Sequence, residues 1–351
     1  MHAPLATPMP SAPASSSIDP AIARGVAFLA RARDPHGGLW RDFSEADGSR
    51  GSDVWISGFV AAHLGAVPQA RPLAAAVARS LAALPRASGG WGYDQQLLED
   101  ADSTAWVLLA ARRSGVALSR EQRLASLRFL LRHEDPRGGF VTYGPRGQTI
   151  FGHVAQREGW FSPQVCVSAS VLTALAAYAS PDLPSIDATA RDLLARSGPD
   201  HLWHPYWWHG FTYATHHVVD ALLQTGHLQA DRSAVITRAV LDARNDDGGW
   251  SGQHPDRSNA FATALALLTL CALEREHPGP SSAERLAAIG RASQRLRAWQ
   301  GDDGCFAPSA ELLVPGGSHS GPMTMVDRGV FTTGCALHAL HDAHERTEAS
   351  R

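Results

Sequence analysis

The sequence predicts an all-α fold, an (α/α)6 barrel (toroid) of six helix-pair repeats in a single domain. Three observations support this prediction. A helix-start pattern centred on a Ser or Thr occurs six times along the chain. A Gly-rich turn recurs at spacings of roughly fifty residues, which is the length of a helix pair with its connections. Between the turns, apolar residues follow the helical period and almost never alternate as in strands.

The composition is that of an ordinary globular protein, with 351 residues, 44% hydrophobic, 19% charged and a net charge of -3. This charge gives no electrostatic basis for binding nucleic acid. All 31 basic residues are Arg. Schiff-base chemistry, pyridoxal phosphate attachment and a Walker phosphate loop are therefore excluded, because each needs a lysine.

Three segments are expected along the chain. Residues 1–19, rich in Pro, Ala and Ser, are expected to be a disordered tail rather than a signal peptide. The barrel is expected over 20–345, and 346–351 form a second tail. The four cysteines are far apart and lack a CxxC spacing, so a reducing cytoplasm is the expected location.

Each repeat begins with an Ala-, Leu- and Arg-rich helical segment, such as residues 21–32 or 123–133. A Gly-rich turn with an aromatic residue follows, and then a second, more apolar helix. We expect the apolar helices to form an inner ring and the polar helices to surround it. The turns lie at 34–40, 86–92, 135–141, 245–251 and 301–306, with a divergent version at 200–208.

Two connections, residues 141–163 and 307–327, are far longer than the others. Both run from a Gly-rich turn to an inner helix, so both are expected at the same end of the barrel. Long loops in compact domains usually act as lids or binding loops, and the simpler alternative is decoration on a tolerant edge.

One acidic residue departs from the pattern of the six repeats. The inner helices carry a hydroxyl column, Ser57, Thr104, Ser168, Thr215, Thr263 and Thr333. The residues two positions earlier are Trp55, Asp102, Cys166, Tyr213, Phe261 and Phe331. An acid among aromatic residues and a thiol makes Asp102 the best catalytic candidate.

The stretch EDADSTAW (99–106) resembles the acid motif of class II terpene cyclases, Asp-any-Asp-Asp followed by Thr-Ala. The repeated Gly-Gly-Trp turns likewise resemble those of the squalene–hopene cyclase and protein prenyltransferase superfamily. Asp100, Asp102 and Thr104 match the motif, while Ser103 stands in place of its last aspartate. The resemblance implies that Asp102 donates the proton that starts cyclisation. The family usually pairs two helical domains, whereas one is expected here.

Asp100, Ser103 and Thr104 are expected to tune this acid. Asp100 opposes its ionisation, because two close carboxylates resist being charged together. The hydroxyls of Ser103 and Thr104 are expected to hydrogen-bond it. Aromatic faces attract a carbocation without trapping it. The predicted substrate-binding residues are therefore Trp55, Trp207, Trp208, Tyr213, Phe261 and Phe331, with His216 as a polar wall residue and Arg157 as a contact for the substrate.

The predicted function is a class II-type terpene or meroterpenoid cyclase acting on a polyprenyl substrate. No cofactor is required, although Mg²⁺ would accompany a diphosphate substrate. No metal site is predicted, because adjacent histidines on a helix point about 100° apart. Peripheral membrane contact and a homodimer are compatible with this prediction.

Two other functions stay open at this point. One is a zinc-dependent prenyltransferase-like enzyme, suggested by the Asp303-Gly304-Cys305 stretch. The other is a non-catalytic toroid that binds a hydrophobic ligand or a partner. In that case Asp102 merely caps its helix and the aromatic column is core packing.

Overall fold

The computed structural model describes residues 19–43, 51–84, 87–151, 155–318 and 321–349. Apart from Asp19, the expected N-terminal tail lies outside the described residues. Asp19 caps the first helix, since its side chain accepts a hydrogen bond from Ala21 N. At the other end, the last helix continues to Ala349, so residues 346–349 are helical and are not the tail that the sequence predicted.

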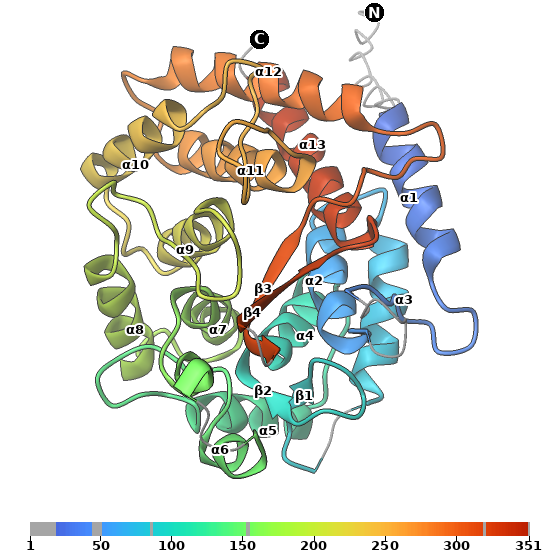
Figure 1. Cartoon of the computed structure of the whole chain (residues 1–351), viewed down its shortest axis with the longest axis vertical. Helices are drawn as coiled ribbons and strands as arrows, with labels where there is room; N and C mark the ends of the chain where they lie inside the picture. The colour runs from blue at the N-terminus through green and yellow to red at the C-terminus, as the bar shows by residue number, and fades with distance from the viewer. Residues whose placement is uncertain (1–18, 44–50, 85–86, 152–154, 319–320, 350–351) are drawn as a thin grey trace, which may run out of the picture.

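In the described part of the chain, six mostly buried helices form a closed ring (Figure 1). Each contacts the next, and the last contacts the first. Their apolar residues make up most of the core, as the sequence predicted for the inner helices. They are α2 (Val54–Gly65), α4 (Ala101–Ser114), α7 (Val165–Tyr178), α9 (Thr212–Gln224), α11 (Ala260–Glu276) and α13 (Val330–Ala349).

A second set of helices surrounds this ring, each with one buried face and one exposed face (Figure 1). They are α1 (Pro20–Ala32), α3 (Arg71–Ala82), α5 (Arg120–Leu131), α8 (Pro184–Ala195), α10 (Ala230–Asp242) and α12 (Ser282–Trp299). The prediction of a mainly α-helical protein is confirmed. Within the described residues, no helix has the length and apolarity needed to cross a membrane.

The hydroxyl column fastens each Gly-rich turn to its inner helix. In every repeat the hydroxyl oxygen accepts a hydrogen bond of 2.8–3.0 Å from the backbone N–H of the aromatic residue after the turn. Where that residue is Trp, its indole N–H also donates to a carbonyl of the preceding outer helix, at 2.7–2.9 Å. The pairs are Ser57–Trp40, Thr104–Trp91, Ser168–Phe140, Thr215–Trp203, Thr263–Trp250 and Thr333–Phe306.

The divergent fourth turn keeps this architecture without a glycine at its left-handed position. Trp203 occupies the position of the turn aromatic, bonded to Thr215 Oγ1 and, through its indole N–H, to Leu193 O. His201 has φ = 63°, a left-handed conformation that glycine adopts at lower cost. Trp207 and Trp208 are therefore additional to the repeat and do not substitute for its turn.

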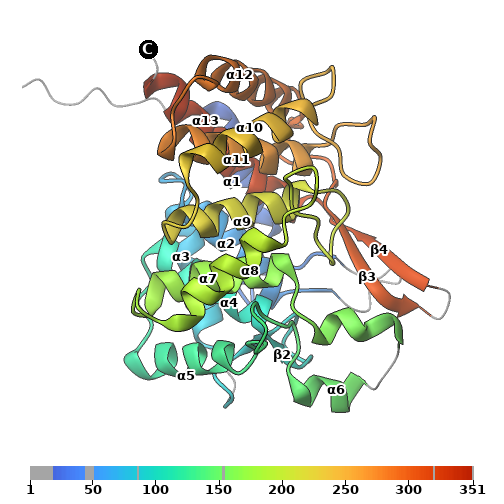
Figure 2. The same cartoon turned by 90° about the vertical axis from the view of Figure 1, so that its left-hand side faces the viewer.

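The two long connections lie on the same side of the ring, as expected (Figure 2). The first contains helix α6 (Pro145–Phe151) and the 3-10 helix η1 (Ala155–Phe161). The second, expected as a loop, instead contains an antiparallel hairpin of β3 (Glu311–Ser318) and β4 (Gly321–Val326). A shorter pair, β1 (Trp91–Gly92) and β2 (Glu99–Asp100), leads into α4.

The hydroxyl column gives a test of what holds the ring together. Thr263→Val leaves the buried N–H of Trp250 unpaired, and we expect a loss of about 1–3 kcal/mol in the free energy of unfolding. Thr269→Val is the matched control in the same helix, because Thr269 Oγ1 bonds only to Leu265 O one turn earlier. Denaturant unfolding should show a clearly smaller loss for the control, and equal losses would contradict the role assigned to the column.

Candidate active site

A pocket of about 370 Å³ opens at the end of the ring that carries the two long connections. Its size falls within the range of small-molecule sites. Aromatic and apolar side chains dominate the lining, which also contains three carboxyl groups, Asp94, Asp100 and Asp102, the last two at the start of α4. Residues along the lining include Phe43, Trp55, Asp100, Asp102, Ser103, Tyr143, Trp160, Cys166, Trp207, Trp208, Tyr213, Leu312 and Met325.

Side chains from two neighbouring repeats hold the Asp102 carboxyl group. Trp55 of α2 donates its indole N–H to Oδ2 at 2.9 Å. Ser170 of α7 bonds Oδ1 through its hydroxyl at 2.6 Å. Both partners lie on helices adjacent to α4, so the ring fixes the direction of the carboxyl group. Asp102 is therefore not the cap of its own helix, a role that Asp100 performs.

Ser103 and Thr104 do not bond Asp102, contrary to the prediction. Ser103 donates its backbone N–H and its hydroxyl to the two carboxylate oxygens of Asp100, at 2.7 and 2.6 Å. Thr104 belongs to the hydroxyl column and bonds the backbone of Trp91 and Asp100. Asp100 caps α4 and draws the Ser103 hydroxyl to its carboxylate, while the bond to Trp91 N holds Thr104, so neither hydroxyl points to the acid.

Burial favours the protonated form of both carboxyl groups. Removal from water raises the pKa of Asp102 to about 6, although the hydrogen bonds from Ser170 and Trp55 act in the opposite direction. Burial also raises the pKa of Asp100 to about 8, with the nearby charge of Asp102 adding to the effect. The charge of Asp102 therefore opposes the ionisation of Asp100, whereas the effect of Asp100 on the acid strength of Asp102 stays a prediction. The pair retains a proton at neutral pH.

The predicted aromatic column lies at the expected end of the ring, and two of its four aromatic members, Trp55 and Tyr213, line the pocket with Asp102. Trp208 contacts Trp55, Tyr213 and Phe331 at ring-centroid distances of 4.4–6.0 Å. Phe43, which the sequence reasoning missed, packs against Trp55 and Trp208 and also lines the pocket. The wall beside the acid is therefore a continuous set of π faces.

Four predicted residues lie outside the pocket lining. Phe261 and Phe331 pack behind Trp208, at 5.3 and 5.4 Å between ring centroids. Thr104 is fully buried in the first turn of α4, where it bonds Trp91 N. His216 is buried beside His217, at 4.8 Å, on the far side of Tyr213 from the acid. It is therefore neither a pocket wall nor a partner of Asp102.

Arg157 and Trp207 are located where the prediction placed them, in the lining. The Arg157 guanidinium lies 5.1 Å from the Trp160 ring and donates to Phe151 O at 3.0 Å. Trp207 donates its indole N–H to Thr142 Oγ1 at 3.2 Å. Among the described lining residues, Arg157 is the one cationic side chain.

The two long connections form a roof over the pocket. The Trp160 indole N–H donates to Pro315 O at 3.0 Å, which joins η1 to β3. Leu313 N donates to Trp207 O at 2.8 Å, which joins β3 to the fourth repeat. Along the hairpin, Leu312, Val314, Met323 and Met325 line the pocket, in keeping with the two-residue period of strands. The chain therefore covers its own pocket.

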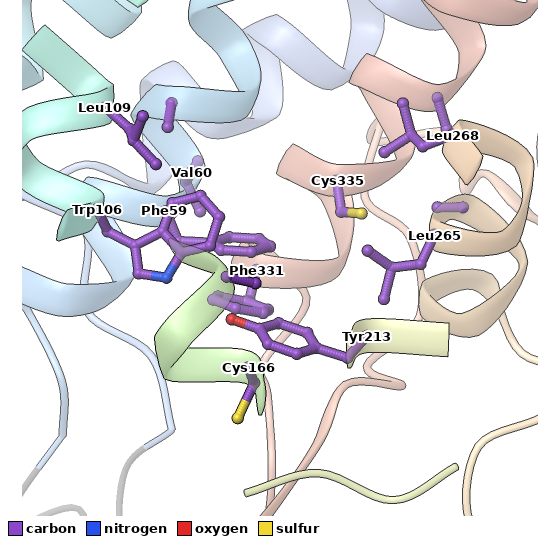
Figure 3. Close-up of a cluster of buried hydrophobic side chains, with 14 of the residues drawn as sticks. Phe59, Val60, Trp106, Leu109, Cys166, Tyr213, Leu265, Leu268, Phe331 and Cys335 are labelled. Atoms are coloured by element: carbon purple, nitrogen blue, oxygen red, sulfur yellow. The ribbon is translucent and has the colours of Figure 1, made fainter. Parts of the chain in front are cut away.

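Ser170 was the main omission from the sequence reasoning, and the repeats contain a signal for it. A second column lies four residues, or one helical turn, after the column that holds Asp102, on the same face of each inner helix. Figure 3 shows members of both columns, with Phe59, Trp106, Leu265 and Cys335 in the second. In that second column Ser170 and His217 are the polar exceptions. The second column comprises Phe59, Trp106, Ser170, His217, Leu265 and Cys335.

No metal centre emerges from the described residues, since they contain no group of three or more His, Cys, Asp or Glu side chains placed to hold an ion. Cys305, part of the zinc alternative, is half-buried in its turn with its thiol against Phe306 O. The structure thus provides no ligand set for the zinc-dependent alternative within this part of the chain.

Comparison with known proteins links this chain to one class of enzyme. No family model matches the chain. A drimenyl diphosphate synthase from Streptantibioticus cattleyicolor is 27% identical over 254 residues, 70% of this chain and 43% of that protein. The chain spans less than half the length of the curated relatives that it matches.

Solved structures match nearly the whole chain. The type II terpene cyclase MstE from Scytonema aligns over 93% of this chain and 97% of its own, with a TM-score of 0.78 at 24% identity. A protein from Actinoplanes aligns over 92% and 98%, with a TM-score of 0.79 at 28% identity. The chain therefore resembles class II terpene cyclases in sequence and in fold.

The raised pKa of Asp102 predicts a pH-dependent effect on stability. A carboxyl group with a folded pKa near 6 and an unfolded pKa near 3.8 destabilises the protein above pH 6, and the cost disappears as the pH falls through that interval. We expect Asp102→Asn to stabilise the protein by roughly 2–3 kcal/mol at pH 8 and by about half as much at pH 5. Denaturant unfolding at both pH values checks this. A gain that is larger at pH 5 would contradict the assignment.

Proposed function

We propose that the chain is a class II-type terpene or meroterpenoid cyclase, in which Asp102 protonates a polyprenyl substrate to start ring closure. The observation that carries the proposal is a carboxyl group of raised pKa, hydrogen-bonded by Trp55 and Ser170, that faces an aromatic pocket. The likeness in fold and sequence to class II terpene cyclases supports the same conclusion. We further propose that the two sets of helices form an (α/α)6 barrel over 20–349.

The first chemical step transfers one proton. The O–H bond of Asp102 breaks, a C–H bond forms at the terminal alkene carbon, and the electron pair of that double bond is used for the new bond. The carboxylate that remains is stabilised by the N–H of Trp55 and the hydroxyl of Ser170, which are already in position before the reaction. Because a pKa of about 6 lies near neutrality, the acid is strong enough to donate and remains partly loaded.

The following steps take place on the carbon chain, and the pocket guides them by its shape and its π faces. Trp55, Trp208, Tyr213 and Phe43 surround the position of the cation. Each such face attracts a desolvated cation by about 0.5–2 kcal/mol and offers no lone pair that would form a bond to it. The last cation passes a proton to water, so substrate and product are isomers and the proton drawn from Asp102 is balanced by one released to solvent.

The pocket fits a substrate with a weakly charged head group better than a diphosphate. Asp94 and Asp100 line the pocket as well as Asp102, whereas Arg157 is the single cation among the described lining residues. A diphosphate would meet this excess of acidic groups, so it would need Mg²⁺ as a counter-ion. One structure of an MstE variant contains geranylgeranyl dihydroxybenzoate, named there as the substrate. A polyprenyl benzoate or phenol is accordingly the substrate class that we propose, with no cofactor required.

We also propose a cellular location and partners for the enzyme. We propose a cytoplasmic enzyme, since the four cysteines are all free thiols. The isoprenoid substrate is the proposed partner, and peripheral contact with a membrane and a homodimer remain proposals. The non-catalytic toroid explains the helices and the aromatic packing equally well, but it gives no reason for a carboxyl group bonded away from its own helix terminus.

Removing the acid tests the proposed function directly. Asp102→Asn keeps the shape of the side chain and the bond from Trp55, and we expect cyclised product to fall by about 10²- to 10⁴-fold. The protein is incubated with geranylgeranyl dihydroxybenzoate and with farnesyl and geranylgeranyl diphosphate plus Mg²⁺, and products are identified by mass spectrometry. Asp187→Asn, on the exposed face of α8, is the control. Equal product from Asp102→Asn and the wild-type protein would end the proposal.

Ser170 is proposed as a positioning residue for the acid. Ser170→Ala removes a bond of 2.6 Å to Asp102, and we expect kcat to fall by about 10- to 100-fold, the equivalent of roughly 1.5–3 kcal/mol for a bond to a charged group. KM should not change, because Ser170 does not line the pocket. Thr173→Val, one turn further along α7, removes a hydroxyl that bonds only Ala169 O and should leave both constants unchanged. A rise in KM with constant kcat would refute the positioning role.

A further inference from the structure

Four histidines fill the ring behind the aromatic floor of the pocket, and the proposed chemistry does not use them. His63 comes from α2, His216 and His217 from α9, and His338 from α13. All four side chains are buried. Their ring centroids are 4.8–6.4 Å apart along the cluster, so each imidazole lies within reach of the next directly or through one water molecule.

The cluster connects the acid to the opposite end of the ring. On the pocket side, the His217 ring lies 4.5 Å from Tyr213 and 5.0 Å from Trp106. The Trp106 indole N–H is close enough to Asp102 to lower its pKa, against the larger effect of burial. On the other side, His338 Nε2 lies 3.6 Å from Asp342 Oδ1, and the side chain of Asp342 is 21% exposed. Polar groups therefore run from solvent to Tyr213, which lines the pocket together with Asp102.

Several atoms in this cluster have no protein partner. Among the described residues, five buried polar atoms of the cluster and its neighbours lack a hydrogen bond, although such atoms are normally satisfied. Polar atoms that converge in a buried space are the usual sites of internal water. We therefore expect water molecules between these rings. The five atoms are Trp106 Nε1, Tyr213 Oη, His63 Nε2, His216 Nδ1 and His217 Nε2.

The contact between His63 and His338 determines which of their ring nitrogens carry a proton. His63 Nδ1 and His338 Nδ1 are 3.0 Å apart. A neutral imidazole carries one N–H and one bare nitrogen, so one of these atoms must donate and the other accept. The rings are neutral, because burial lowers the pKa of each of the four histidines. The pair is thus a hydrogen-bonded couple of neutral tautomers, which can pass a proton from one ring to the other.

We propose that these histidines and the water between them carry protons from solvent near Asp342 to Asp102, and so reload the acid after each turnover. This proposal rests on the proposed function. A proton taken up at His338 Nε2 releases the one on its Nδ1 to His63 Nδ1. The Nε2 proton of His63 then passes through water to His217. His217 passes a proton on through a water molecule beside Tyr213 to the Asp102 carboxylate. Each imidazole then exchanges its N–H proton with neighbouring water and regains its starting tautomer before the next turnover.

The route keeps the histidines apart from the substrate. Phe59 and Phe331 stack at 3.9 Å and Trp208 covers Phe331 at 5.4 Å, so apolar rings separate the substrate from the histidines. Water between the histidines therefore stays apart from the carbocation, and the last water, beside Tyr213, adjoins the pocket.

Turnover kinetics test the proposal. His63→Ala interrupts the relay while Asp102 starts out protonated, so we expect a first turnover at the wild-type rate followed by a steady state at least tenfold slower. Imidazole added to this variant should restore the steady state, whereas pyrrole, of similar shape but without a basic nitrogen, should not. His133→Ala is the control, because His133 is equally buried but bonds Phe129 O on an outer helix.

Two results would overturn the relay. One is wild-type turnover in folded His63→Ala, or an equal loss in its first turnover and its steady state. The other is a crystal structure at high resolution without ordered water beside His63 Nε2 and His217 Nε2. If Asp102→Asn makes no product while the steady-state turnover of His63→Ala equals that of the wild-type protein, the relay alone is refuted. Full activity of Asp102→Asn would instead refute the proposed function.

Discussion

One hydrogen bond, repeated six times, is the constraint on which the fold and the site depend. A hydroxyl near the start of each inner helix binds the backbone N–H of the aromatic residue that ends the preceding turn. This bond fixes the rotation of each inner helix about its axis. The residues two before and two after the hydroxyl consequently face the inside of the ring. Asp102, Trp55 and Ser170 meet there because three neighbouring helices have been given the same rotation.

The site shows how a ring can raise the pKa of an acid and still orient it. The carboxyl group of Asp102 belongs to α4, but its partners belong to α2 and α7. Asp100 takes over the capping of α4, which leaves Asp102 free to turn inward. Burial then raises the pKa of Asp102 more strongly than the two hydrogen bonds lower it. Two aspartates thus share the work: Asp100 caps the helix, and Asp102 is free to face the pocket.

The fold could be predicted because the chain repeats itself, and the site could be predicted only in part. Comparison of the six copies identified the inner helices, the end of the ring where the pocket lies, and Asp102 as the exception. The partners of Asp102 come from other repeats, so local reasoning assigned them wrongly to Ser103 and Thr104. His216 was selected as an anomaly one position from the hydroxyl, whereas the helical period turns His217 inward. The hairpin at 311–326 escaped because its alternation covers only four pocket-facing residues.

The fourth repeat separates two tasks that the other repeats combine. His201 takes the left-handed position of this turn in place of glycine, and Trp203 makes both hydrogen bonds of the ring. The next few residues, 205–208, are consequently released from holding helices together, and they place Trp207 and Trp208 in the wall of the pocket. Variation in this short segment can change the shape of the pocket wall while the bonds between turns and inner helices stay the same. Under the proposed function, changes in this segment would alter which products form, because they change the pocket wall and not the bonds of the hydroxyl column.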